Sequence, residues 1–178
     1  LDVVAGVDDG ALVDAGVRNE IAGGSFTMLM WVYPKRYDHC RCLVSQTAEY
    51  GFSMEKASDS HAVKFWWFNG SQFRDPAFNH VPPLRAWSHL AVTYDGKVVR
   101  LYFNGLPDSA PVPATDVARK NSKLYIGRHP IAQPERNWKG LIDEFMVYDR
   151  ALSEGEIDEI WELQATDEAL KKRKEGSP

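Results

Sequence analysis

Turn signals recur along this chain between short stretches rich in β-branched and aromatic residues, at roughly eight to twelve residue intervals. Asn69-Gly70, Asp95-Gly96 and Asn104-Gly105 are dipeptides typical of tight turns between antiparallel strands. Many short strands joined by such turns bury a core by stacking one antiparallel sheet on another or by closing into a barrel. The spacing therefore predicts an all-β sandwich or barrel.

The apolar pattern places the strands between these turns. The run 26–33 is apolar on both faces, which predicts a central strand, and Pro34 is expected to end it. The other expected strands are 43–46, 50–54, 63–68, 87–94, 98–103, 124–127 and 140–148.

The last expected strand leads into the one expected helix. Ser153 followed by Glu156 is a capping box, and Ile157, Ile160 and Trp161 follow at helical spacing, so a short helix is expected to pack back onto the body. In the strand itself, period 2 places Asp143 on the same face as the apolar residues Leu141, Phe145 and Val147.

Composition limits the classes of function. The 178 residues suit one domain, and we expect it to span 1–164, followed by a tail or linker over 165–178. A formal net charge of −4 argues against nucleic acid as a partner. No apolar run approaches the length of about 20 residues that a membrane helix requires, so membrane insertion is not expected.

Four segments, in this order, resemble the concanavalin A-like, laminin-G-type jelly-roll domains. They are FTMLMWVYP, WSHLAVTYDGKVVRLYFNG, YIGR and GLIDEFMVYDRALSEGEI, and the likeness extends from about residue 3 to residue 163. The resemblance implies two antiparallel sheets packed as a curved sandwich. It also implies an extracellular or cell-surface module of lectin-like or adhesion type, often attached to polysaccharide-degrading enzymes.

The resemblance further implies a structural Ca²⁺ between an N-terminal turn, here containing Asp8 and Asp9, and the aspartate of the last strand, Asp143. The family often has an Asp-Gly before this turn, where the chain has Ala5-Gly6. The residues give an independent argument, because a carboxylate on the apolar face of a strand needs a cation or hydrogen bonds. The alternative is that Asp143 caps backbone N–H groups and the other two aspartates are turn residues.

Strand alternation also separates two neighbouring tryptophans. Trp67 belongs to the apolar set with Val63 and Phe65, so Trp66 is expected to face outward. A ring exposed on a sheet face is suited to stacking on the C–H surface of a sugar.

The same alternation leaves His89, Arg100 and Tyr102 outward on the next two strands. If these strands share a sheet with Trp66, the four residues line one outer, concave face, with rings for stacking and Arg and His for hydroxyl or acidic groups. The alternative is that they pack under a long loop.

The loop that holds Arg128, His129 and Trp138 is a second candidate for binding carbohydrate, because loops on a rigid scaffold often bind ligands. Its alternative is a solvated loop that Trp138 anchors. Cys40 and Cys42 are interpreted as two ordinary thiols, with a metal site or a vicinal disulfide as the alternatives.

The acids Glu156, Asp158 and Glu159 resemble the start of the catalytic strand of jelly-roll glucanases. That chemistry requires the acids to alternate on a strand, whereas the capping box predicts a helix. The sequence thus favours a non-catalytic, lectin-like carbohydrate-binding module of a larger secreted or surface protein. An extracellular protein-interaction or structural adhesion domain is the alternative, and a glycoside hydrolase is third.

Overall fold

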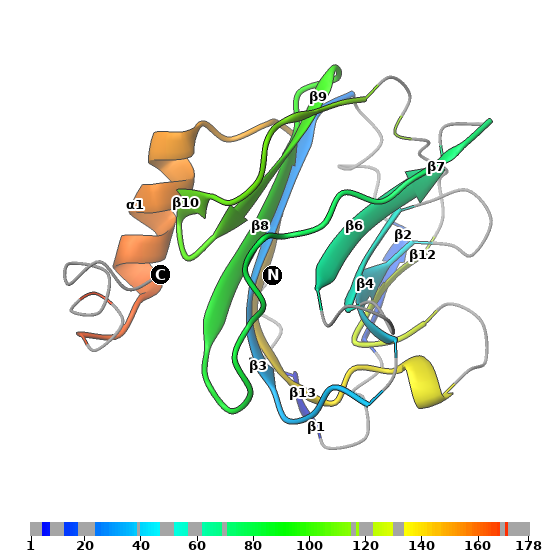
Figure 1. The fold of residues 1–178 in the computed structure, drawn as a ribbon, viewed down its shortest axis with the longest axis vertical. Coiled ribbons are helices and arrows are strands. Elements are labelled where there is room, and N and C mark those ends of the chain that lie inside the picture. Colours follow the sequence, from blue (N-terminus) through cyan, green and yellow to red (C-terminus); the bar gives the residue numbers. More distant parts are fainter. Residues whose placement is uncertain are drawn as a thin grey trace.

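The computed structural model of the chain describes residues 5–7, 13–17, 24–38, 40–46, 52–56, 62–68, 71–114, 117, 123–129, 134–167 and 170. Within them, two antiparallel sheets face each other, and one helix lies outside the first sheet (Figure 1). This arrangement confirms the predicted two-sheet sandwich with a short C-terminal helix.

The first sheet has seven strands. Its order is β1-β13-β3-β8-β9-β10, and β11 also pairs with β9. The bounds are β1 Ala5–Val7, β13 Gly140–Tyr148, β3 Phe26–Pro34, β8 Ser88–Tyr94, β9 Val98–Phe103, β10 Leu106–Pro107 and β11 Val112–Pro113. The central position predicted for 26–33 is confirmed, since β3 lies between β13 and β8.

The second sheet has six strands in the order β2-β12-β4-β5-β6-β7. The bounds are β2 Val13–Val17, β12 Lys123–Ile126, β4 Arg41–Ser45, β5 Phe52–Lys56, β6 Val63–Phe68 and β7 Phe73–Arg74. A short 3₁₀ helix, η2 (Pro134–Arg136), follows β12 and lies close to β4.

The main core lies between the two sheets, and the predicted alternation determines its membership. Val63, Phe65 and Trp67 of β6 are fully buried there, together with the inward residues of β8 and β9. The alternate positions of β6 are only half-buried. Period-2 burial on a strand such as β6 is what the packing of one sheet face against another produces, whereas β3 and β8 are buried on both faces.

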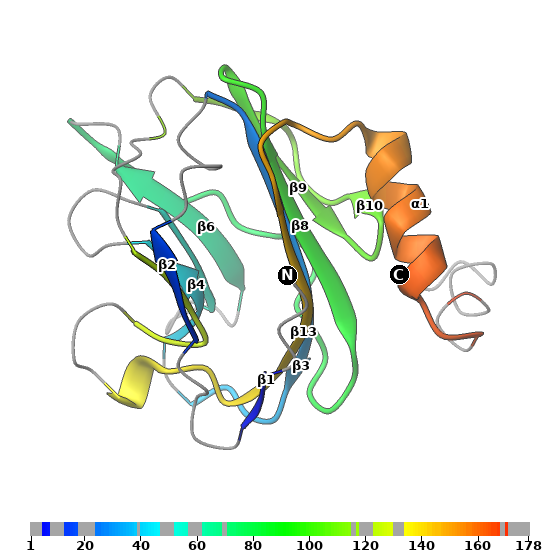
Figure 2. The same ribbon diagram turned by 180° about the vertical axis from the view of Figure 1, so that it is seen from behind.

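A second, smaller core lies on the other face of the seven-stranded sheet, beneath helix α1 (Glu154–Gln164). It consists of buried residues from β3, β8 and β9 with two from the helix region: Leu29, Ala91, Tyr102, Leu152 and Ile157. Seen from behind, α1 again lies on the side of this sheet that faces away from β2, β4 and β6 (Figure 2). The helix is therefore a third layer.

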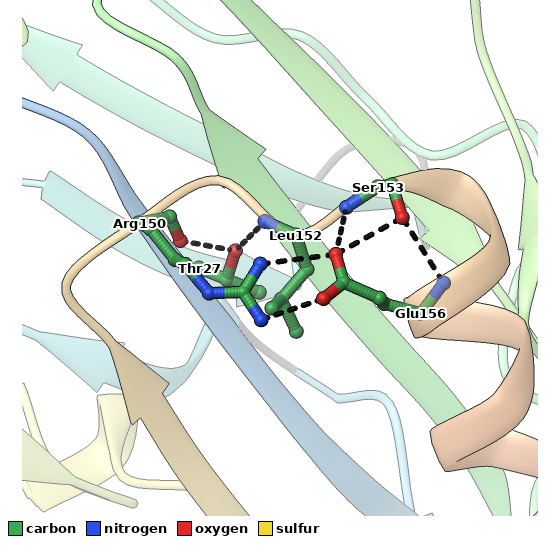
Figure 3. Close-up of polar contacts among 5 residues, drawn as sticks. All are labelled: Thr27, Arg150, Leu152, Ser153 and Glu156. Carbon is green, nitrogen blue, oxygen red and sulfur yellow. Dashed lines mark hydrogen bonds and ion pairs between the residues drawn. The ribbon is translucent and has the colours of Figure 1, made fainter.

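Buried hydrogen bonds hold the connection between β13 and α1. The Oγ1 of Thr27 in β3 accepts the N–H of Leu152 at 2.8 Å and donates to the carbonyl of Arg150 at 2.9 Å (Figure 3). At the start of the helix, Ser153 and Glu156 form the predicted capping box. The helix thus begins where the sequence predicted it to begin.

Candidate functional site

Three aromatic side chains gather on the outer face of the six-stranded sheet. We call Trp66, Phe68 and Phe73 the aromatic cluster. The ring centroid of Phe73 lies 4.9 Å from that of Phe68 and 6.0 Å from that of Trp66. Trp66 and Phe68 are half-buried, whereas Phe73 is 64 % exposed. The Phe73 ring is inclined by 47° to Phe68 and by 64° to Trp66, and together the three rings present an apolar patch to solvent.

Strand register explains how the aromatic cluster forms. Trp66 and Phe68 are two residues apart on β6 and so point to the same face, away from Trp67 and the main core. Phe73 on β7 lies directly opposite Phe68, and opposite residues of antiparallel strands project to one face. The predicted outward orientation of Trp66 is confirmed.

An ion pair borders the aromatic cluster. Lys64 lies two residues before Trp66 on the same face of β6, and its Nζ is 3.1 Å from the Oδ2 of Asp75. Both side chains remain accessible to solvent. The pair places a cation and an anion beside the rings, which is the mixture of apolar and polar groups that a carbohydrate site needs.

The same outer face also holds Arg128 and Tyr125. Tyr125 alternates with the core residues Leu124 and Ile126 on β12 and therefore faces outward. The Cζ of Arg128 lies 5.5 Å from the centroid of the Tyr125 ring, a cation–π arrangement. The structure thus brings Arg128 and Trp66 onto one sheet face, although the sequence assigned them to separate candidate sites.

The expectation that Trp66 shares a face with His89, Arg100 and Tyr102 is wrong. Trp66 is on β6 of the six-stranded sheet, whereas the other three are on β8 and β9 of the seven-stranded sheet. Their outward orientation is correct, but it points toward the opposite side of the molecule. Alternation within a strand gives no information about which sheet the strand joins.

His89 and Tyr102 do not reach solvent, because α1 covers that face. His89 is completely buried, and its ring centroid lies 5.4 Å from that of Trp31, whose indole N–H donates to Gln164 of the helix at 3.0 Å. Burial lowers the pKa of His89 to about 3, so the imidazole is neutral at physiological pH. Burial also raises the pKa of Tyr102. Neither side chain is available to a glycan in this structure.

Arg100 remains partly exposed on the outer face of the seven-stranded sheet. Its Nη1 lies 2.8 Å from the Oδ2 of Asp95, and this hydrogen bond raises the pKa of the guanidinium and lowers the pKa of the carboxyl group. Since Asp95 also accepts the N–H groups of Lys97 and Val98, the pair stabilises the turn between β8 and β9. Arg100 therefore has a structural partner.

The three candidate residues in the loop from 128 to 138 differ in burial. Trp138 lies in the main core with only 2 % of its surface exposed, and its Nε1 donates to the carbonyl of Leu141 at 3.2 Å. His129 is also buried, and its N–H donates to Asn137. The expectation that these two side chains contact a sugar is wrong, whereas the alternative role of Trp138 as the anchor of the loop is correct. Only Arg128 remains accessible.

Asp143 does not lie on the core face. The register of β13 against β3 shifts between Asp143 and Met146, and Glu144 has a left-handed backbone with a φ of 48°. This bulge turns Asp143 to the outer face, while Phe145 enters the main core. The expectation that Asp143 aligns with Phe145 and Val147 is wrong, because the extra residue breaks the period of two.

The carboxylate of Asp143 caps the backbone, as the alternative reading proposed. Its Oδ1 accepts the N–H of Glu144 at 2.8 Å. Asp8 and Asp9 lie outside the described residues. The preceding residue, Val7, is opposite Gly140, which is about 10 Å along the strand from Asp143. Among the described residues, no group of three His, Cys, Asp or Glu side chains is arranged to hold a metal. The binding of a structural Ca²⁺ ion therefore remains a prediction.

The acids near the C-terminus lie on a helix, as predicted. Glu156 accepts from Ser153 and pairs with Arg150, whose Nη2 is 2.6 Å from the Oε1 of the glutamate (Figure 3). The hydrogen bonds from Arg150 and Ser153 lower the pKa of Glu156 to about 2. A capping carboxylate held in this way is an acceptor in the folded protein and is not available as a proton donor.

Alternation on the strand 63–68 places Phe68 on the same face as Trp66, but sequence reasoning did not include it among the site residues, and it missed Phe73 and Tyr125. Phe68 and Phe73 flank the Asn69-Gly70 turn signal, which favours a hairpin that pairs them. Tyr125 alternates with Leu124 and Ile126, so its outward position could also be predicted from the sequence.

In the cysteine pair, both Cys40 and Cys42 are thiols, which agrees with the interpretation as ordinary thiols.

Similar structures agree with the fold. The chain is similar to domain 4 of AbnA, a GH43 extracellular arabinanase from Geobacillus stearothermophilus, solved in complex with arabinotriose. The identity is 19 %, the TM-score is 0.68, and the match covers 89 % of this chain and 81 % of that one. The SAP-like pentraxin from Limulus polyphemus has 14 % identity and a TM-score of 0.61, covering 90 % and 76 %.

A third similar structure is the binding domain of botulinum neurotoxin DC in complex with rat synaptotagmin II. The identity is 15 %, the TM-score is 0.67, and the match covers 91 % of this chain and 42 % of that one. None of the curated proteins matches the sequence. No helix among the described residues is both long and apolar enough to cross a membrane.

The family assignment comes from the sequence itself. The family model described as the concanavalin A-like lectin/glucanases superfamily matches residues 6–158, which include most strands of both sheets and the start of α1. The chain belongs to the concanavalin A-like lectin/glucanase superfamily.

Proposed function

We propose that this domain is a non-catalytic carbohydrate-binding module of a larger secreted or surface protein that acts on polysaccharide. The observation that carries the proposal is the aromatic cluster of Trp66, Phe68 and Phe73 on the outer face of the six-stranded sheet. Sugar rings have apolar C–H faces, and aromatic rings that are accessible and fixed by a sheet bind them by stacking.

Two further observations support the proposal. The similar domain of the extracellular arabinanase was solved with arabinotriose, which makes a role beside a polysaccharide-degrading enzyme a reasonable expectation for this fold. The acids that resemble a glucanase strand lie on α1, where Glu156 is held by Ser153 and Arg150. A non-catalytic role accords with this use of the carboxylate.

A panel of soluble polysaccharides in a binding screen tests the proposal. We expect the wild-type protein to bind at least one polymer, and Trp66→Ala or Phe73→Ala to weaken that binding by about tenfold with little change in melting temperature. Trp87→Ala is the matched control, because Trp87 is also exposed but packs against Tyr33 of the seven-stranded sheet. If Trp87→Ala loses binding and Trp66→Ala keeps it, the wrong face has been assigned.

A protein-interaction domain is the second candidate function. The 64 % exposure of Phe73 favours it, because an apolar ring so far from the core suits a protein interface as well as a sugar. The similar toxin domain was solved with synaptotagmin II, a protein partner. A protein that binds no polymer in the panel, yet loses a protein partner on Phe73→Ala, would support this candidate instead.

A further inference from the structure

We propose that Tyr125 and Arg128 form a subsite for an acidic sugar, at the far end of a row that begins at Trp66. The ligand is then a linear polysaccharide that carries carboxylate groups and lies across the strands of the six-stranded sheet. This inference rests on the proposed carbohydrate-binding function and adds the chemical class of the ligand.

The register of neighbouring strands determines which residues form the row between Tyr125 and Trp66. Tyr125 of β12 lies opposite Ser45 of β4, Ser45 lies opposite Ser53 of β5, and Ser53 lies opposite Trp66 of β6. Residues directly opposite each other in antiparallel strands occupy the same face. The row starts and ends with an aromatic residue. At β4 it lies beneath the backbone of Arg128, because Ser45 is fully buried and donates to the Arg128 carbonyl, so a ligand that joins the two ends passes over Arg128.

The length of the row suits a chain rather than a single sugar. Three strand spacings separate β12 from β6, which corresponds to about 14 Å. Several linked sugar rings span that distance when they run perpendicular to the strands. A monosaccharide would reach only one end, so the two aromatic positions act together only on an extended ligand.

The backbone at Arg128 is fixed on both sides. The buried hydroxyl of Ser45 donates to the carbonyl of Arg128 at 2.9 Å. The N–H of Gly127 donates to Leu43 at 2.7 Å, and the carbonyl of Gly127 accepts from the anchor residue Trp138 at 2.9 Å. A side chain that starts from a rigid position loses less conformational freedom when it binds a ligand.

The guanidinium of Arg128 is positioned but not neutralised. Its Cζ lies over the Tyr125 ring, and no described residue forms an ion pair with it. Arg100 and Arg150, in contrast, each pair with a carboxylate. A planar guanidinium with unused donors binds a carboxylate through two parallel hydrogen bonds.

Polymers that differ only in charge test the inference. We would measure affinity for polygalacturonate against its methyl ester, carboxymethyl cellulose against hydroxyethyl cellulose, and alginate against its propylene glycol ester. The wild-type protein is expected to prefer the charged member of at least one pair by about tenfold. Arg128→Gln should remove that preference, and Arg128→Lys should restore part of it. Arg85→Gln, at an exposed arginine elsewhere, is the matched control for lost charge.

Each outcome has a separate meaning. Equal affinity for both members of every pair, or a preference that persists in Arg128→Gln, overturns the acidic subsite. If the protein binds neutral polymers through Trp66 and no charged polymer better, the subsite is wrong and the carbohydrate-binding function stands. If it binds no polymer of the panel or of the pairs, both proposals fall together.

Discussion

The two outer faces of the sandwich both carry aromatic residues, but they differ in exposure to solvent. On the six-stranded sheet, Trp66, Phe68 and Phe73 extend toward solvent. On the seven-stranded sheet, the aromatic residues Trp31 and Tyr102 are buried beneath α1. Alternation along a strand identifies the side chains that point away from the main core. It does not show whether those side chains are exposed to solvent or covered by another layer of the structure.

The covered face is held by both apolar and polar contacts. Leu29, Ala91 and Tyr102 of the sheet pack against Leu152 and Ile157 in a core of their own. This packing makes the helix a structural layer and leaves the six-stranded sheet as the face with accessible rings. The comparison predicts that aromatic truncations on the two faces have different consequences.

The largest expected effect is on stability, from Trp161→Ala. Trp161 is buried where α1 meets the turn before β10, and a Cβ added at Gly105 would lie only 3.0 Å from the Trp161 Cβ. Gly105 has a φ of 84°, so the turn and the tight approach both require glycine. Removing the indole should lower the free energy of unfolding by about 3–5 kcal/mol, measured by urea denaturation.

Trp66→Ala is the matched variant on the other face, with an expected loss below about 1 kcal/mol. A Trp161→Ala loss as small as that of Trp66→Ala would mean that the helix is peripheral, and the contrast between the two faces would fail.

A smaller effect concerns pH. The pKa of His89 falls from 6.5 to about 3 on burial, so the unfolded chain takes up a proton at a pH where the folded protein does not. Stability should therefore decline as pH drops from about 6.5 toward 3, with a slope of up to about 1.4 kcal/mol per pH unit from this group. His89→Gln should flatten that slope in urea unfolding at a series of pH values. An unchanged slope would place the imidazole in contact with water.

Local structure was predictable because each element has its own pattern. The bounds of β6 and the start of α1 at the Ser153 cap follow from residues within a few positions. The resemblance carried by four segments added the two-sheet topology. The predictions from local patterns and from the resemblance agree with the structure, because turn chemistry, alternation and capping all favour the same fold.

The site was less predictable because it depends on long-range pairing. The separation of Trp66 from His89 depends on which sheet each strand joins, and the row from Trp66 to Tyr125 crosses four strands. The outward turn of Asp143 depends on a bulge at Glu144, where no glycine or asparagine marks the positive φ. No local sequence signal specifies any of these three features.

An NMR titration of the labelled protein with an oligosaccharide of the best polymer tests whether the outer face of the six-stranded sheet binds the glycan. We expect the signals of the Trp66 indole N–H and of the amides of β6, β7 and β12 to shift, while those of the Trp31 indole N–H and the Arg100 amide do not. Shifts centred on β8, β9 and α1, with Trp66 unaffected, would contradict it.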